Sequence, residues 1–376
     1  MNYESLLWDG VLKRKQRNYN QILKYEYLLN EFKKIKRNCR NRKMVYLFEM
    51  NLNQNLLIIL KELYQKKYKF SNYRVFIINN PKYRIIMSEN MSDKLVNHLV
   101  SSQILLPILE PVLIDTNVAT RIGKGSGYAF DVLVKYINSL CLLKQEIYIL
   151  KIDIKKYFYS INHEILLSKI KEYIKDPKIL MIVKEIINTT NESYLNNEID
   201  RLKKIEINKV KRMQISQKEK NIKIKQIENL PKYQYKKGLP IGNMTSQILA
   251  VFYLNGLDHY IKEELKCKYY IRYMDDLVIL DYDYNKLKIY FKLITEKIND
   301  LDLEINNKSN ISKLSNGFTF LGYTFKIDNN LTIKCANKTY YRIKRYLKKL
   351  KKYNPEKYKR SIASYKGYLA KSNLVK

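Results

Sequence analysis

The run RYMDDLVIL, residues 272–280, constrains the fold more than any other feature, because two adjacent carboxylates stand inside an apolar, strand-like segment. Burying one carboxylate without a partner is costly, and two neighbouring carboxylates also repel each other. A divalent cation removes both costs. A tight hairpin turn would offer Asp275 and Asp276 to such a cation as the hard oxygen ligands that Mg²⁺ prefers. The sequence therefore predicts a metal-binding β-hairpin.

A second strand with one carboxylate is predicted by the run IYILKIDI, residues 147–154, whose acid is Asp153. If this strand lies next to the Asp275–Asp276 turn, three carboxylates surround a site for two metal ions. Such a site can drive in-line attack of a 3′-hydroxyl on a nucleoside triphosphate. We therefore expect Asp153, Asp275 and Asp276 to act together.

The charge of the chain indicates a polyanionic partner. Its 376 residues include 71 Lys and Arg against 36 Asp and Glu, a net charge of +35, and the pI is about 9.7. Because the basic excess is spread along the chain, a long nucleic acid is favoured over one small phosphate pocket. An AT-rich coding sequence, which enriches Lys, Asn, Ile and Tyr, is the alternative explanation of this composition.

Other compartments and ligands find little support in the sequence. The most apolar stretch, residues 104–114, contains Pro107, Glu110 and Pro111, so we expect no membrane span and no membrane partner. The amino terminus, MNYESLLWDG, lacks a signal-peptide pattern. The four cysteines are far apart and have no His at metal-ligand spacing, which argues against zinc and disulfides and favours a reducing cytoplasm: Cys39, Cys141, Cys267 and Cys335.

Hydrophobic residues make up 46% of the chain, enough for a sizeable core in two or three compact units. Periodicity predicts helices, hairpins and loops in a mixed order. The expected elements are helices over 1–70, a hairpin over 73–87, a helix over 93–112, a Gly-rich basic loop over 119–129, a strand over 147–154, a helix over 245–267, a hairpin over 269–280, a helix over 284–300, a short β region ending at Ile327, and a basic helical carboxy-terminal part.

Residues 188–237 form the polar part of the chain and are dense in Lys, Asn, Gln and Glu. We interpret them as an insertion with little apolar surface to bury. Two readings stay open: a solvent-exposed helical hairpin, or a basic arm that contacts RNA and takes its stability from that partner.

Four motifs, in their order along the chain, resemble those of reverse transcriptases. Residues 153–158 (DIKKYF) resemble the first catalytic motif, GLPIGNMTSQ (residues 238–247) the second, YMDD (residues 273–276) the third, and FLGY (residues 320–323) the primer grip. The similarity runs from about residue 73 to residue 323 and does not cover the basic amino terminus or the insertion.

The resemblance implies an α+β right-hand polymerase whose palm has an antiparallel sheet. Its expected parts are fingers with a basic helical N-terminus over 1–145, a palm over 146–327 with the insertion at 188–237, and a small helical thumb over 328–376.

The resemblance also implies roles for individual residues. It assigns Asp153, Ile154, Asp275 and Asp276 to two Mg²⁺ ions, with Mn²⁺ as a possible substitute, and Lys308 to protonation of the leaving pyrophosphate. The implied substrate-binding residues are Lys82, Arg84, Phe158, Ile241, Gly242, Gln247 and Tyr273.

Three of these roles have a specific physical basis. Phe158 is expected to be the steric gate against a ribose 2′-hydroxyl, with plain core packing as the alternative. Lys82 and Arg84 suit a triphosphate, with surface salt bridges as their alternative. Gly242, which has no Cβ, is expected to let the backbone approach the template base.

The chain most resembles the reverse transcriptases of diversity-generating retroelements. Three segments carry this resemblance: GLPIGNMTSQ, ATRIGKGSGYA (residues 119–129) and SYKGYLAKSN (residues 364–373). Ile241 stands where retroviral and group II intron enzymes usually carry Gln, so base selection is expected to loosen, unless Ile241 only marks a lineage.

Two alternatives remain open: an antiphage-defence reverse transcriptase working with a non-coding RNA, and a non-catalytic RNA-binding scaffold. The implied partners are template RNA, cDNA product, dNTPs and a structured non-coding RNA, with an accessory protein or homo-oligomer also possible. The implied setting is the cytoplasm of a bacterium, with the gene bacterial or phage-encoded.

Overall fold

The computed structural model describes residues 18–39, 41–79, 82–328 and 330–373. The chain divides into two compact units of interleaved segments. The first, here called the helical unit, comprises Met1–Ile114, Lys155–Asp258 and Ile298–Glu304. The second, the sheet unit, comprises Asp115–Ile154, His259–Lys297 and Ile305–Lys376. The expected division into fingers, palm and thumb stays a prediction.

The helical unit begins with amphipathic helices, as the three- and four-residue spacing of apolar side chains predicts. They are α2 (Tyr19–Ile22), α3 (Tyr25–Asn38), α4 (Arg42–Glu49) and α5 (Leu52–Tyr64). The Asn18 and Asn41 side chains accept N-cap hydrogen bonds from the first turns of α2 and α4. The prediction of helices over residues 1–70 is confirmed for these segments. Residues 1–17 and 40 of that range lie outside the described residues.

The predicted hairpin over 73–87 is confirmed as β1 (Arg74–Asn79) and β2 (Tyr83–Ser88), an antiparallel pair. Residues 80 and 81 of its Asn-Asn-Pro turn lie outside the described residues.

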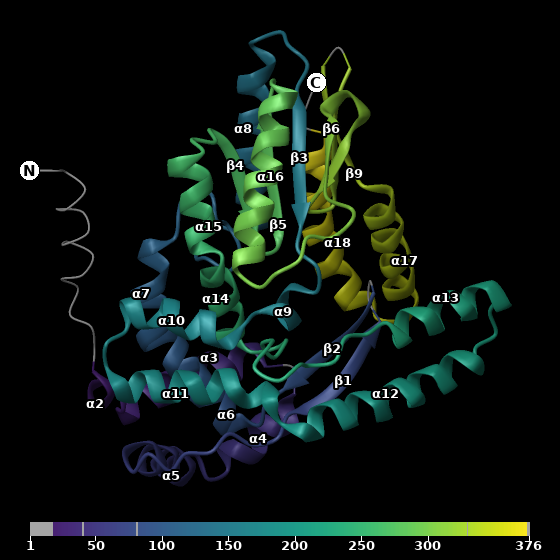
Figure 1. The fold of residues 1–376 in the computed structure, drawn as a ribbon. Coiled ribbons are helices and arrows are strands. Elements are labelled where there is room, and N and C mark those ends of the chain that lie inside the picture. The colour runs from purple at the N-terminus through teal and green to yellow at the C-terminus, as the bar shows by residue number, and fades with distance from the viewer. Residues whose placement is uncertain (1–17, 40, 80–81, 329, 374–376) are drawn as a thin grey trace, which may run out of the picture. The chain divides into compact units, whose positions relative to one another are not determined.

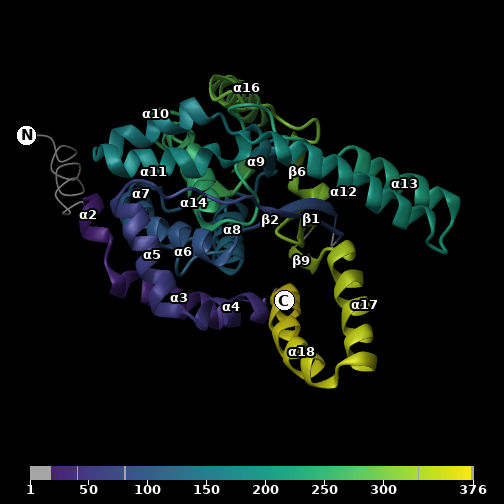
Figure 2. The ribbon, with the colours of Figure 1, turned by 90° about the horizontal axis from the view of Figure 1, so that it is seen from below.

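The polar insertion forms two helices that pack on this hairpin, α12 (Ser193–Lys211) and α13 (Gln217–Glu228). Both views draw them as a long antiparallel pair that extends beyond β1 and β2 (Figures 1 and 2). The insertion joins a buried cluster with Tyr73, Val75, Tyr83, Ile85 and Met87, to which it contributes Leu195, Ile199, Val210, Ile227, Leu230 and Tyr233. The expectation that it has little apolar surface to bury is therefore wrong: isoleucines and leucines spaced along a lysine-rich helix still line one narrow face.

The expected helix over 93–112 is built from four consecutive helical segments: α6 (Met91–Val100), a π-helical turn (Ser101–Leu105), α7 (Leu106–Leu109) and a 3₁₀ turn (Glu110–Val112). Among the described residues, Met91–Val112 is the one helix long and apolar enough to cross a membrane, which the sequence did not lead us to expect. Half of the most apolar 18-residue stretch of this helix is buried inside the protein. The core helix of a soluble protein can be equally long and apolar. Length and composition are thus weak evidence for a span.

Five further helices belong to the helical unit. They are α9 (Tyr157–Ser160), α10 (His163–Tyr173), α11 (Pro177–Asn188), α14 (Met244–Tyr253) and α15 (Asn255–His259). The single helix expected over 245–267 is interrupted, because α14 ends at Tyr253 and the turn Tyr260–Glu264 after α15 is π-helical.

The sheet unit contains an antiparallel four-stranded sheet in the order β4-β5-β3-β6 (Figure 1). Its strands are β3 (Tyr148–Asp153), β4 (Tyr269–Tyr273), β5 (Asp276–Asp281) and β6 (Asn310–Lys313). Ile149, Leu150 and Leu277 are fully buried, which explains the almost uninterrupted apolar runs in the sequence. Helix α8 (Ser126–Cys141) packs on β4 and β5, and α16 (Tyr284–Asp300) follows β5.

A second sheet completes this unit with β7 (Phe318–Phe320), β8 (Tyr323–Ile327) and β9 (Leu331–Cys335). The β region therefore does not end at Ile327, as the sequence suggested, because β9 pairs with β8 from Leu331 to Cys335. Helices α17 (Asn337–Tyr353) and α18 (Pro355–Ala370) then form a helical hairpin (Figure 2). Helices and antiparallel sheets together confirm the α+β class.

Candidate active site

The three predicted carboxylates lie on neighbouring parts of the sheet unit: Asp153 on β3, Asp276 on β5, and Asp275 in the turn between β4 and β5. Asp153 ends β3 and stands opposite Asp276, the first residue of β5. Asp276 is also opposite Tyr273 of β4, so Met274 and Asp275 form a two-residue hairpin turn. The adjacency that a two-metal site requires is thus met by the strand register.

The Asp276 carboxylate has a basic neighbour in the same sheet. Among the described residues, no group of three or more His, Cys, Asp or Glu side chains is arranged to hold a metal ion. Instead, the Lys151 ammonium of β3 lies 3.5 Å from Asp276 Oδ1. The expectation that Asp153, Asp275 and Asp276 surround a site for two metal ions stays a prediction. Because neighbouring carboxylates repel one another, a basic side chain beside Asp276 offsets part of this repulsion.

The hairpin turn is held in an uncommon backbone conformation. Met274 has a φ of 57°, a region that residues other than glycine rarely adopt. The fully buried Arg272 donates from Nη1 to the Met274 carbonyl at 2.8 Å. Its own backbone pairs with the loop before α8, donating to Thr116 O and accepting from Val118 N. Sequence reasoning missed Arg272, although a single arginine in a buried strand was a signal for such a role.

The backbone around Asp153 is fixed from both sides. Its N–H donates to Ser309 Oγ at 2.9 Å, and its carbonyl accepts from Asn306 N at 2.7 Å. The next residue, Ile154, donates its N–H to Asp275 O at 3.4 Å. Because the Ile154 side chain is buried and apolar, only its carbonyl could serve a metal ion.

Lys308 is exposed in the loop that contacts Asp153. This loop, residues 306–309, closes on itself, since Ser309 N donates to Asn306 O at 2.9 Å. The structure therefore places Lys308 two residues from the Asn306 amide that binds the Asp153 carbonyl. Tyr273 is half-buried and packs against the core of the same unit.

The other predicted residues belong to the helical unit. Phe158 lies in α9, half-buried, with its ring edge-on to Tyr157 at 5.9 Å. Its carbonyl accepts from Leu239 N at 2.7 Å, which ties the first motif to the second. Gln247 is an exposed residue of α14 between the buried Ser246 and Ile248.

Gly242 is explained by packing against β2. Its φ is 142°, and an added Cβ would lie 2.1 Å from the Met87 carbonyl oxygen. The Met87 N–H donates to Ile241 O at 2.8 Å, so the second motif is pinned to the hairpin. The close backbone approach expected for Gly242 is found, but its observed partner is β2, and approach to a template base stays a prediction.

The hairpin itself presents Lys82 and Arg84 to solvent. Both side chains are exposed, whereas the alternate residues Tyr83 and Ile85 are buried, as the two-residue period of a strand requires. Two exposed basic side chains therefore lie at the start of β2, Lys82 directly before the strand and Arg84 within it.

A buried polar network behind the second motif was not predicted. Thr245 donates to Asn97 Oδ1 at 2.8 Å, and Asn97 Nδ2 donates to the Glu89 carboxylate. Burial raises the pKa of Glu89 to about 8, and the nearby Asp93 contributes in the same direction. Beside it, Asn243 donates from Nδ2 to the Tyr73 hydroxyl at 2.7 Å. The sequence signal that could have predicted this network was the presence of polar residues within otherwise apolar helices.

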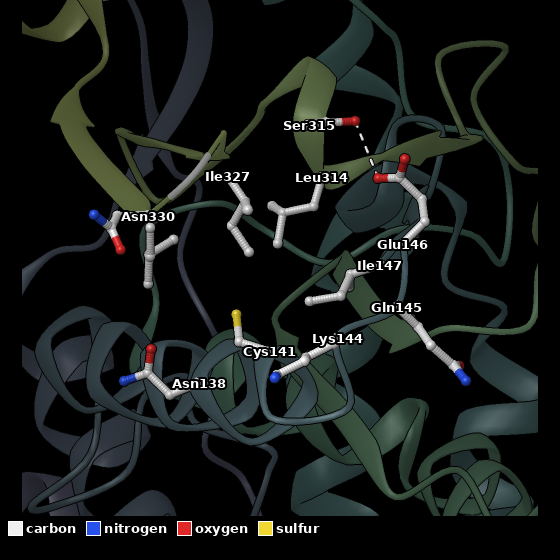
Figure 3. Close-up of a pocket in the computed structure, with 11 residues that line it drawn as sticks. Asn138, Cys141, Lys144, Gln145, Glu146, Ile147, Leu314, Ser315, Ile327 and Asn330 are labelled. Carbon is white, nitrogen blue, oxygen red and sulfur yellow. Dashed lines mark hydrogen bonds between the residues drawn. The ribbon is translucent and has the colours of Figure 1, made fainter.

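A separate pocket of about 390 Å³ lies elsewhere in the sheet unit and contains none of the predicted site residues (Figure 3). In it Ser315 donates to Glu146 at 3.0 Å across the rim, and Leu314 and Ile147 form part of an apolar floor. Burial raises the pKa of the Cys141 thiol, which disfavours the reactive thiolate.

Comparison with solved structures finds two telomerases among the similar chains. One is telomerase from Candida albicans in complex with a fragment of telomeric RNA: TM-score 0.43, 13% identity, 78% of this chain covered and 50% of that one. The other is apo telomerase from Candida tropicalis truncated from its C-terminal domain: TM-score 0.39, 15% identity, 68% and 53% covered. This chain spans about half the length of each.

No curated protein matches the chain. The family model described as reverse transcriptase (RNA-dependent DNA polymerase) matches residues 65–325, which include the carboxylate-bearing strands and the segment pinned to β2. The chain belongs to the reverse transcriptase family.

Proposed function

We propose that this protein is an RNA-directed DNA polymerase that copies an RNA template into cDNA from dNTPs. The observation that carries the proposal is the register of β3 and β5, which sets Asp153 opposite Asp276 beside the Asp275 turn. Membership of the reverse transcriptase family supports the same activity.

Divalent ions fit the chemistry of this donor set, since hard carboxylate and carbonyl oxygens suit Mg²⁺, with Mn²⁺ as substitute. The residues that would hold two ions are Asp153, Asp275 and Asp276, with the Ile154 carbonyl. When bound, the ions would supply positive charge to the attacking and leaving oxygens. Lys151 keeps Asp276 paired at 3.5 Å until a stronger cation competes for it.

The chain's own residues would bind and orient the substrates. Lys82 and Arg84 hold the triphosphate through charge-assisted hydrogen bonds, which their exposure at the start of β2 permits. Phe158 excludes a ribose 2′-hydroxyl. Lys308 donates the proton to the leaving pyrophosphate.

The remaining assignments concern the template, primer and nucleotide. Ile241, Gly242 and Gln247 contact the template base and incoming nucleotide, and Tyr273 supports the primer terminus beside the turn. The FLGY hairpin, residues 320–323, is the primer grip. These roles rest on the resemblance of the motifs.

The subtype that we propose is a bacterial or phage-encoded enzyme of a diversity-generating retroelement, acting in the cytoplasm. GLPIGNMTSQ, ATRIGKGSGYA and SYKGYLAKSN support it. Sequencing the nucleic acid that copurifies with the protein tests this proposal: RNA transcribed from a variable repeat supports it, and a structured non-coding RNA beside defence genes would indicate antiphage immunity instead.

The activity is tested by primer extension on an RNA template with Mg²⁺ and dNTPs. We expect Asp275→Asn to lower incorporation by about a hundredfold or more, because a metal ligand is lost at a step that depends on charge stabilisation. RNA binding should be unchanged, since the basic surface is intact. The control is Asp300→Asn, which changes an exposed carboxylate at the end of α16.

Near-parental extension by Asp275→Asn would refute the metal-site assignment. A parent protein that binds RNA but extends no primer, with either metal, would favour the non-catalytic scaffold.

A further inference from the structure

The FLGY hairpin has a strained turn. Phe320 pairs with Tyr323, so Leu321 and Gly322 form a two-residue connection between β7 and β8. Both have left-handed backbones, with φ of 49° and 88°. This pattern matches the right-handed twist of hairpin strands, but it is unfavourable for a leucine. Something outside the turn must hold it in place.

Helix α18 supplies that contact through Tyr368. The rings of Tyr368 and Tyr323 stack with centroids 4.6 Å apart and planes 29° apart. The Tyr323 hydroxyl donates to Tyr368 O at 3.0 Å, and the Tyr368 hydroxyl donates to Leu321 O at 3.3 Å. An added Cβ on Gly322 would lie 2.4 Å from the Tyr368 hydroxyl. Tyr368 thus covers the turn directly.

The end of α18 is anchored as well. Lys371 Nζ lies 2.9 Å from Asp131 Oδ1 and donates to Gly127 O at 3.3 Å, both on α8. The same ammonium stands 5.0 Å from the centre of the Phe130 ring, and that ring lies 4.7 Å from the Tyr323 ring. A continuous set of contacts therefore runs from α8 through Lys371 and Tyr368 to the turn. Burial within it raises the pKa of Tyr323 to about 12.

We infer that Tyr368 is a positioning residue that holds the FLGY turn in its strained conformation, with Lys371 fixing the helix end that carries it. The inference rests on the proposed function, in which this turn contacts the primer strand. It gives two residues of the segment SYKGYLAKSN, Tyr368 and Lys371, a defined role: their contacts position the turn at the primer end and do not bind the nucleotide.

Two substitutions distinguish the hydrogen bond of Tyr368 to Leu321 from the stacking of its ring on Tyr323. Tyr368→Phe removes the hydrogen bond to Leu321 and keeps the stacked ring, whereas Tyr368→Leu removes both. The matched controls are Tyr365→Phe and Tyr365→Leu, because Tyr365 lies on the same helix and pairs edge-on with Tyr346 of α17 at 6.1 Å.

The kinetic readout is the KM for primer–template measured apart from the KM for dNTP and kcat. We expect Tyr368→Phe to raise the primer–template KM about threefold and Tyr368→Leu about tenfold or more, the scale of one or two lost contacts. The dNTP KM and the melting temperature should change little, and both Tyr365 variants should stay within twofold of the parent.

A double-mutant cycle gives an independent check. Gly322→Ala introduces a Cβ against the Tyr368 hydroxyl, so its defect should be smaller in the Tyr368→Leu background than alone. Additive defects would overturn the inference, as would an unchanged primer–template KM. A parallel loss of melting temperature, kcat and both KM values would show a purely structural role and overturn it too.

Affinity for an RNA–DNA duplex with a recessed 3′ end, measured without dNTPs, keeps this test separate from that of the proposed function. If the parent extends no primer, the proposed function fails. The positioning role then stands if Tyr368→Leu weakens duplex binding more than Tyr365→Leu does, and falls if the two bind equally.

Discussion

At the scale of single residues, two basic side chains organise the carboxylate turn. Lys151 pairs with Asp276, and the buried Arg272 holds the Met274 carbonyl. A buried guanidinium is retained where its donors are satisfied and its charge is compensated, so Arg272 fixes the turn backbone on which Asp275 stands. Residues beside the carboxylates therefore shape the site as much as the carboxylates do.

The burial of Glu89 predicts that the stability of the protein depends on pH. Its pKa in the folded protein is about 8, above the usual 4.5, because the carboxyl is buried. The folded state therefore keeps a proton that the unfolded chain loses, and the free energy of unfolding should fall as pH rises from about 5 to about 8.

We expect Glu89→Gln to remove most of this decline, worth up to a few kcal/mol since one pKa unit corresponds to about 1.4 kcal/mol. Urea unfolding between pH 5 and pH 8.5 measures it. Glu185→Gln, which changes an exposed residue of α11, is the control. Parallel profiles for the parent and Glu89→Gln would contradict the prediction.

At the scale of elements, the pair α12 and α13 combines a buried face with an exposed basic face. Lys203 has a structural role, because its ammonium donates hydrogen bonds to Glu228 O and Leu230 O at the end of α13. Lys204, Lys211 and Lys225 are exposed instead. The hypothesis of an RNA-binding arm therefore concerns these exposed lysines.

Replacing Lys204, Lys211 and Lys225 with Gln removes charge and preserves helix propensity. If each contacts a phosphate of a structured RNA, the slope of log affinity against log salt should fall by roughly 0.7 to 0.9 per lysine. The control replaces Lys171, Lys175 and Lys184, exposed lysines on α10, α11 and their connection. A slope equal to that of the parent would mean that the arm is only a solvated surface.

At the scale of the whole molecule, the net charge of +35 predicts that RNA binding and the proposed catalysis depend on different groups. Binding to a polyanion draws on many lysines and arginines, whereas nucleotide transfer depends on ions at a few carboxylates. Chelation with EDTA should therefore abolish primer extension and leave RNA affinity at fixed ionic strength within about threefold, about 0.7 kcal/mol.

Filter binding and extension on the same samples measure both quantities, and added Mg²⁺ should restore extension. Extension that persists in EDTA would contradict the metal assignment. A joint loss of RNA binding would show that the ions also hold the nucleic acid.

The sequence by itself determined the elements whose pattern is local. Apolar runs with one acid or one acidic pair specified β3, β4 and β5, because a strand with a hairpin turn can bury those neighbours while Asp275 in the turn and Asp276 beside it stay partly exposed. The order of the motifs then identified the family, and the family model that matches residues 65–325 confirms it.

Only the tertiary structure decided which distant residues meet. The pairing of Lys151 with Asp276, the contact of Gly242 with Met87, the buried face of α12, and the cover of Leu321 by Tyr368 all join positions far apart in the chain. The periodicity of apolar residues predicts which face of an element is buried. It does not predict which other element covers that face, because the partner depends on the packing of the whole unit.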